Sequence, residues 1–149
     1  MEYGILILFH LLGAAVWTGG HLVLALSVLP LALKERNPEI IHRFEERYER
    51  VGIPALVVQI LTGLRLAMLF QPNVSEWFQL GDRVSAHIAL KLGLLAVTLV
   101  LALHARLRLV PRLNRDNLGY LAGHIVAVTV LAVSFVLVGV SLRIGGFVW

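Results

Sequence analysis

The 149-residue sequence contains no cysteine and only two methionines, Met1 and Met68. The absence of cysteine excludes disulfide bonds, thiolate metal sites and thiol redox chemistry. Soft Cu(I) ions are bound in proteins mainly by cysteine and methionine sulfur. The sequence therefore argues against a copper pathway built on sulfur ligands.

Charged residues are also scarce. They make up 15% of the sequence, hydrophobic residues make up 58%, and the mean hydropathy is +0.84. Soluble domains carry about 25% charged residues, and a chain this short cannot bury so much apolar surface in a water-soluble core. We therefore expect an integral membrane protein surrounded by the lipid bilayer.

Four apolar segments are long enough to cross a bilayer, which takes about 20 helical residues. They cover approximately residues 4–33, 51–70, 85–109 and 118–142. Lipid offers no hydrogen-bond partner to the backbone, so each segment must be a helix. The sequence predicts one all-α domain over residues 1–149, an integral membrane four-helix bundle without repeats or a second domain.

Most basic residues lie in the first and third connections between these segments, whereas the second connection contains only Arg83. The positive-inside rule places the basic connections in the cytoplasm and both termini outside, with the inner membrane of a bacterium as the expected location. The net charge of +4 is therefore explained by the basic residues of these cytoplasmic connections. It does not indicate that the protein binds nucleic acid. Apolar residues at helical spacing within residues 40–51 predict a short amphipathic cytoplasmic helix that runs into the second span.

Four histidines lie inside the predicted spans: His10, His21, His104 and His124. An ionisable side chain within lipid is costly and usually faces the bundle interior, where it has a partner. Imidazole is also the commonest metal ligand. At 3.6 residues per turn, His10 and His21 face nearly the same way, with Trp17 between them. These positions predict a bound haem or metal ion.

The predicted topology arranges the polar residues of the spans in two layers. The outer layer contains His10, Arg65, His87, Lys91 and Arg143. No acidic residue lies within the spans except Glu2 at their very start, so an anionic ligand such as a haem, with its propionates, would balance the outer layer. The inner layer contains His21, His104 and His124, which suit either haem ligation or a Cu(II) or Zn(II) site.

Several motifs resemble the CopD-type family of membrane proteins, which are similar to copper resistance protein D. They are Phe9–Gly20 (FHLLGAAVWTGG), Thr62-Gly63-Leu64, Leu90-Lys91-Leu92, His104-Ala105-Arg106-Leu107 with Pro111, and the ending from His124 to Gly146. The resemblance implies a four-helix membrane protein associated with copper resistance or copper uptake.

The layout is also similar to that of HemJ-type protoporphyrinogen oxidases, which are haem b membrane enzymes. The resemblance implies that a first-span histidine and a third-span lysine are key residues, and His10 and Lys91 stand at those positions. His104 also fits a third-span histidine, whereas His21 and His124 are additional.

The leading hypothesis is a CopD-like protein that binds one or two b-type haems for electron transfer or membrane redox chemistry. Whether it is an oxidoreductase is left open, and a quinone is one candidate redox partner. His10 and a third-span partner would hold an outer haem beside Trp17. Positive charge from Lys91, Arg65 and Arg143 would counter the propionates, and Lys91 is also a candidate iron ligand.

The inner histidines, His21, His104 and His124, would hold a second haem or a copper ion. The alternative hypothesis is a protein for copper uptake or resistance that binds copper at these histidines and at His10, without haem. A third hypothesis is a structural subunit whose histidines only form hydrogen bonds. The sequence leaves the oligomeric state open.

Overall fold

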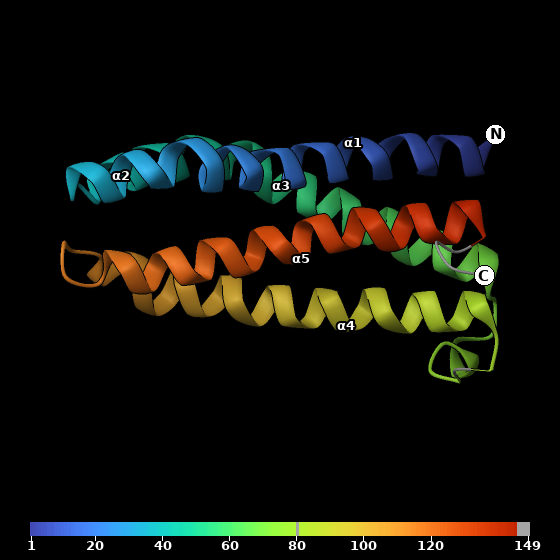
Figure 1. Ribbon diagram of the computed structural model, residues 1–149. Helices are drawn as coiled ribbons and strands as arrows, with labels where there is room; N and C mark the ends of the chain where they lie inside the picture. The colour runs from blue at the N-terminus through green and yellow to red at the C-terminus, as the bar shows by residue number, and fades with distance from the viewer. Residues whose placement is uncertain (80, 146–149) are drawn as a thin grey trace.

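The computed structural model describes residues 1–79 and 81–145, and over these ranges the chain forms four long helical rods that run side by side (Figure 1). Gly146, part of the C-terminal motif, lies outside the described residues. The first rod consists of α1 (Glu2–Val23), the π-helix η1 (Leu24–Val28) and α2 (Leu29–Glu35), and the second rod is α3 (Glu39–Phe70). The third consists of α4 (Arg83–His104), the π-helix η3 (Ala105–Leu109) and the 3-10 helix η4 (Val110–Arg112), and the fourth is α5 (Leu118–Ile144). A short 3-10 helix, η2 (Val74–Glu76), lies between the second and third rods.

These four rods confirm the predicted all-α bundle, and each is long and apolar enough to cross a membrane. Residue 1, the 71–82 connection and the end of α5 lie together at what we call the terminal end (Figure 1). The 36–38 and 113–117 connections lie at the opposite, loop end. The start of α1 and the end of α5 are thus on one side of the bundle, as the predicted topology requires.

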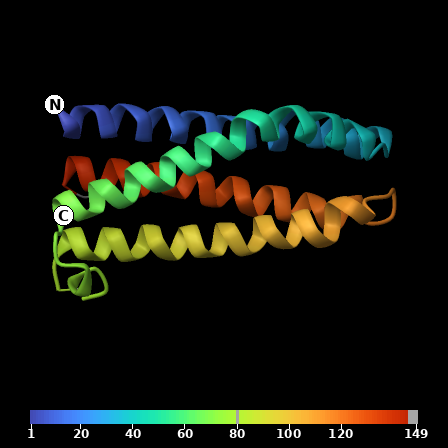
Figure 2. The ribbon, with the colours of Figure 1, turned by 180° about the vertical axis from the view of Figure 1, so that it is seen from behind.

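The predicted amphipathic segment is the first third of α3 and not a separate helix. The side chain of Asn37 accepts a hydrogen bond of 3.1 Å from the backbone N–H of Glu39, which supports the start of this helix. Pro54 lies inside α3 without ending it, although a proline removes one backbone hydrogen bond. Figure 2 shows α3 crossing obliquely from α1 at the loop end towards α4 at the terminal end.

Two π-helices interrupt the first and third rods close to the loop end. The helix η1 ends two residues before Pro30, and η3 ends two residues before Pro111. Proline offers no N–H to the carbonyl four residues earlier, so a regular α-turn cannot close there. At both places the backbone forms a wider π-turn just before the proline.

The two clusters of buried apolar residues lie in the loop half and the middle of the bundle. There α1 and α2 pack against α3 and α5, and α4 packs against α5. The buried residues at the loop end are Leu24, Leu29, Ala32, Ile41, Leu118, Leu121 and Ile125, and a second cluster contains Trp17, Val128 and Ala132. Hydrogen bonds join the same spans, since the Thr129 hydroxyl donates to the carbonyl of His21 at 3.2 Å.

Many large apolar side chains are exposed on the surface of the bundle. Leu26 is 75% exposed, Leu107 67% and Val100 66%. A soluble protein rarely exposes apolar patches of this extent, whereas lipid tails solvate such residues. The outer surface therefore agrees with an integral membrane protein.

Candidate cofactor site

A cavity of about 160 Å³ lies in the terminal half of the bundle. All four spans line it, and most of its wall comes from apolar residues of α3 and α4. It is partly open. The polar residues in its wall are His10, Gln59, His87, Lys91 and Thr98, and the indole of Trp17 is also part of the wall.

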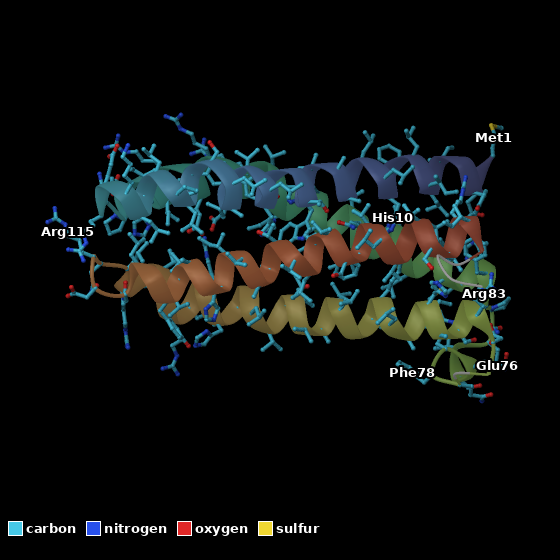
Figure 3. The ribbon with its side chains drawn as sticks, in the orientation of Figure 1. Met1, His10, Glu76, Phe78, Arg83 and Arg115 are labelled. Carbon is cyan, nitrogen blue, oxygen red and sulfur yellow. The ribbon has the colours of Figure 1, made fainter. Side chains whose placement is uncertain are left out.

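His10 points from α1 towards the interior of the bundle (Figure 3). Its Nδ1 donates to the carbonyl of Gln59 at 3.0 Å and lies 3.1 Å from the hydroxyl oxygen of Thr62. Because a carbonyl only accepts, Nδ1 carries the proton of the neutral ring and Nε2 keeps its lone pair. Among the described residues, Nε2 has no hydrogen-bond partner. Metal-ligating histidines are typically held in this way through the other ring nitrogen.

Gly63 on α3 makes room for the His10 ring. A Cβ built on Gly63 would lie 3.0 Å from Cε1 of His10, closer than an unstrained carbon–carbon contact of about 3.5–4.0 Å. The sequence motif Thr62-Gly63 thus supplies both a hydrogen-bond partner and the space for this imidazole.

Lys91 brings an amine to the same cavity from α4. Its Nζ approaches α5 at Gly139, where an added Cβ would lie 3.5 Å from the nitrogen. Within residues 1–79 and 81–145, Lys91 has no hydrogen bond or ion pair, and Oε1 of Gln59 is buried without a hydrogen-bond partner. Unpaired polar groups are costly in apolar surroundings. The wall of the cavity thus includes one residue with an unpaired amine and one with an unpaired amide oxygen.

His87 also lines the cavity, but both of its ring nitrogens are engaged. Its Nδ1 donates to the carbonyl of Arg83 at 2.7 Å, and its Nε2 lies 3.4 Å from the hydroxyl oxygen of Ser141 on α5. His87 is therefore a weaker candidate for a metal ligand than His10.

His21 belongs to an aromatic cluster next to the cavity. Its ring packs against Trp17 with the ring centroids 4.3 Å apart, and its Nδ1 donates to the Trp17 carbonyl at 2.9 Å. Tyr48 meets the His21 ring edge-on at 5.9 Å. The Tyr48 hydroxyl donates to the carbonyls of Val16 and Trp17, at 3.2 and 3.1 Å. Trp17, only 8% exposed, connects this cluster to the cavity wall.

His104 and His124 form a pair outside the cavity, near the loop end of α4 and α5. Nδ1 of His104 lies 3.0 Å from Nε2 of His124, and the two rings are stacked with an interplanar angle of 28°. His104 is exposed and His124 is half-buried. In the part of the chain that the structure describes, no group of three or more His, Cys, Asp or Glu side chains could share a metal ion. His21 is thus not brought together with this pair.

The two arginines of the predicted outer layer lie away from the cavity wall. Nε of Arg65 forms an ion pair of 2.7 Å with the carboxylate of Glu2, and both side chains are about half exposed. Arg143 is exposed in the last turn of α5. Lys91 is therefore the cation that lines the cavity within the described chain.

Sequence reasoning missed two residues of the site. The backbone carbonyl of Gln59 holds the His10 ring in place. A polar glutamine inside an apolar span was the sequence signal that could have identified this residue. Tyr48 was assigned to the amphipathic segment, although it lies opposite Gly20 and one turn before Gly52, which together leave space for its ring.

Comparison with known proteins places the chain in a family. Residues 42–142 match the family described as copper resistance protein D, CopD. The chain belongs to the CopD family. The matched region covers α4, almost all of α5 and all of α3 except its first three residues, so Lys91, His104 and His124 lie inside it, whereas His10 and His21 precede it. No curated protein and no solved structure matches the chain.

The cavity of this CopD protein has donors that suit a haem. A free imidazole nitrogen, an unpaired amine and apolar walls match an axial ligand, a propionate partner and a porphyrin face. The enclosed volume is smaller than the roughly 300–1,000 Å³ of most ligand pockets. A porphyrin would therefore have to extend beyond the enclosed volume, through the open side of the cavity.

Proposed function

We propose that this CopD-family protein binds a b-type haem in the cavity of the terminal half and acts in membrane redox chemistry. The observation that carries the proposal is the geometry of His10, whose Nδ1 is held by Gln59 and Thr62 while Nε2 remains free beside an apolar cavity. Bundle proteins commonly hold cofactors by such inward side chains on facing helices.

In this proposal the chain supplies the surroundings that a haem requires. His10 would be an axial ligand, with its orientation fixed by the carbonyl of Gln59. The amine of Lys91 would pair with an anionic propionate, which removes the cost of an unpartnered amine in the cavity. Apolar residues of α3 and α4 would exclude water from the ring faces. A bound haem supplies one-electron transfer, and a quinone is one candidate partner for it.

The test is an absorption spectrum of the purified protein, oxidised and reduced with dithionite, together with iron and copper counts per chain. A purification tag without histidine avoids adventitious metal. We expect a Soret band, sharp α and β bands after reduction, and loss of these bands in His10→Ala. The matched control, His42→Ala on the first third of α3, should retain them.

A second candidate function is copper handling without haem, which the description of the CopD family favours. It predicts a colourless protein that carries copper. That result, or a haem spectrum unchanged in His10→Ala, would refute haem binding through His10.

A further inference from the structure

An open groove lies on the first third of α3, near the loop end, and the proposed haem site makes no use of it. The side chains that line it are Arg43, Phe44, Arg47 and Tyr48, and we call it the α3 groove. We propose that the α3 groove binds an anionic phospholipid from the surrounding leaflet. The two arginines would hold the phosphate of the headgroup, and the two aromatic rings would support the glycerol end of the lipid.

The length of α3 places this groove at the level of the lipid headgroups. The apolar part of the helix, residues 51–70, is about 30 Å long at 1.5 Å per residue, which equals the hydrocarbon thickness of a typical bilayer. Arg47 and Arg43 therefore lie about 6 and 12 Å beyond the start of that part, measured along the helix. Because α3 crosses the bundle obliquely (Figure 2) and arginine side chains are long, both guanidinium groups can reach the headgroup layer.

The two arginines are spaced so that one anion can bind to both. They are four residues apart, so they share a face of α3 with their Cβ atoms about 5–6 Å from each other, and like charges at this spacing repel. Nε of Arg43 pairs with Glu39 at 3.2 Å, which leaves its two Nη atoms available. Arg47 has no hydrogen bond or ion pair within the described residues. A phosphate between the two would offset their repulsion and accept hydrogen bonds from both.

The other carboxylates of this helix segment face away from the groove. Glu49 pairs with Arg106 on η3, and Glu45, one turn earlier, lies on the same face of α3 as Glu49. Each residue turns the helix by about 100°, so Glu46 lies about 160° around α3 from Phe44. The side of α3 that bears the groove is therefore positively charged, which complements an anionic headgroup.

Phe44 and Tyr48 give the groove a fixed apolar floor. Their rings are stacked, with centroids 5.5 Å apart and an interplanar angle of 18°. The Tyr48 hydroxyl is held by two carbonyls of α1, and Phe44 packs against the buried cluster at the loop end. A surface that is already ordered loses little conformational entropy when a ligand binds. A free phosphate ion would contact only the arginines, whereas a lipid would also cover the two rings, so the groove favours a lipid.

The experiment uses the full-length protein in detergent. Melting temperatures are measured during titration with phosphatidylglycerol, which is anionic, and with zwitterionic phosphatidylcholine, and retained lipid is counted by native mass spectrometry. We expect the larger stabilisation from phosphatidylglycerol, with one molecule retained per chain. In the double variant Arg43→Gln/Arg47→Gln its affinity should fall about 10-fold or more, because hydrogen bonds to charged groups are strong. Glutamine is a good helix former, so this variant should fold.

The matched control is the double variant Arg112→Gln/Arg115→Gln, which removes the same charge from the loop end outside the groove (Figure 3). Its affinity for phosphatidylglycerol should stay close to that of the wild type. An equal fall in both double variants would overturn the proposal, because only general charge attraction would then operate. Equal stabilisation by the two lipids would also overturn it, as would inorganic phosphate that stabilises the protein as much as phosphatidylglycerol does. The haem spectrum should be the same in both variants, which separates this groove from the proposed function.

Discussion

The ring of Tyr48 on α3 occupies the space that a side chain on Gly20 of α1 would need. From this position its hydroxyl reaches the carbonyls of Val16 and Trp17 on α1, and its ring edge meets His21. Gly20 thus allows the first two spans to approach closely in the middle of the bundle, as does Gly13, where an added Cβ would lie 2.9 Å from the carbonyl oxygen of Ala55.

Gly20→Ala should therefore destabilise the protein. The added methyl group would overlap the Tyr48 ring, and such overpacking costs about 1–3 kcal/mol. Gly19→Ala is the matched control, because nothing lies within 4 Å of a Cβ at Gly19, and alanine there should be neutral or stabilise the helix. Thermal unfolding followed by circular dichroism measures both changes. Equal melting temperatures for the two variants would contradict the close Gly20–Tyr48 contact.

Lys91→Met should have opposite effects on the empty and the loaded protein. Methionine removes an unpaired amine from an apolar cavity, so the cofactor-free protein should become more stable. Haem retention should fall, because the propionate loses its partner. The measurements are the melting temperature of the cofactor-free protein and the haem content per chain, with Lys34→Met as an exposed control. A variant that loses both stability and haem would indicate that Lys91 has only a structural role.

Gly63→Ala should displace the His10 ring, since the new Cβ would lie 3.0 Å from its Cε1. A displaced axial ligand should shift or broaden the Soret band and reduce haem content. Gly93→Ala on α4, where a Cβ would meet nothing within 4 Å, is the control. Identical spectra for the two alanine variants would argue against His10 as the ligand.

Gln59→Leu should stabilise the cofactor-free protein. Oε1 of Gln59 is buried without a partner, and an unsatisfied buried polar group costs about 1–3 kcal/mol. The backbone carbonyl that holds His10 remains in the variant, so haem binding through His10 should persist. Gln79→Leu, at an exposed position, should change the melting temperature little. A destabilised Gln59→Leu protein would mean that Oε1 has a partner after all.

Much of the fold followed from the sequence, because lipid requires spans to be apolar and helical. The shared location of His10, His87 and Lys91 in the cavity wall also agrees with the predicted outer layer. The depth of a residue in the membrane follows from its position along the span, and this depth alone was enough to group these three residues.

Contacts across helices could not be predicted in the same way. Arg65 forms its ion pair with Glu2 because the start of α1 lies beside the end of α3. The depth of Arg65 in the membrane does not by itself reveal which helix lies next to it. His21 and the His104–His124 pair were expected at similar depths. The rotation of each helix, which pattern alone does not fix, directs His21 to Trp17 and Tyr48 instead.

The π-helices before Pro30 and Pro111 also bear on how related chains can differ in length. A π-turn contains one residue more than the α-turn it replaces, so it absorbs a single inserted residue without moving the helices on either side. A relative that lacks one residue in Leu24–Val28 or Ala105–Leu109 could form a regular turn there and keep the rest of its bundle in register. These two segments are therefore where single-residue insertions and deletions should be found when related chains are aligned.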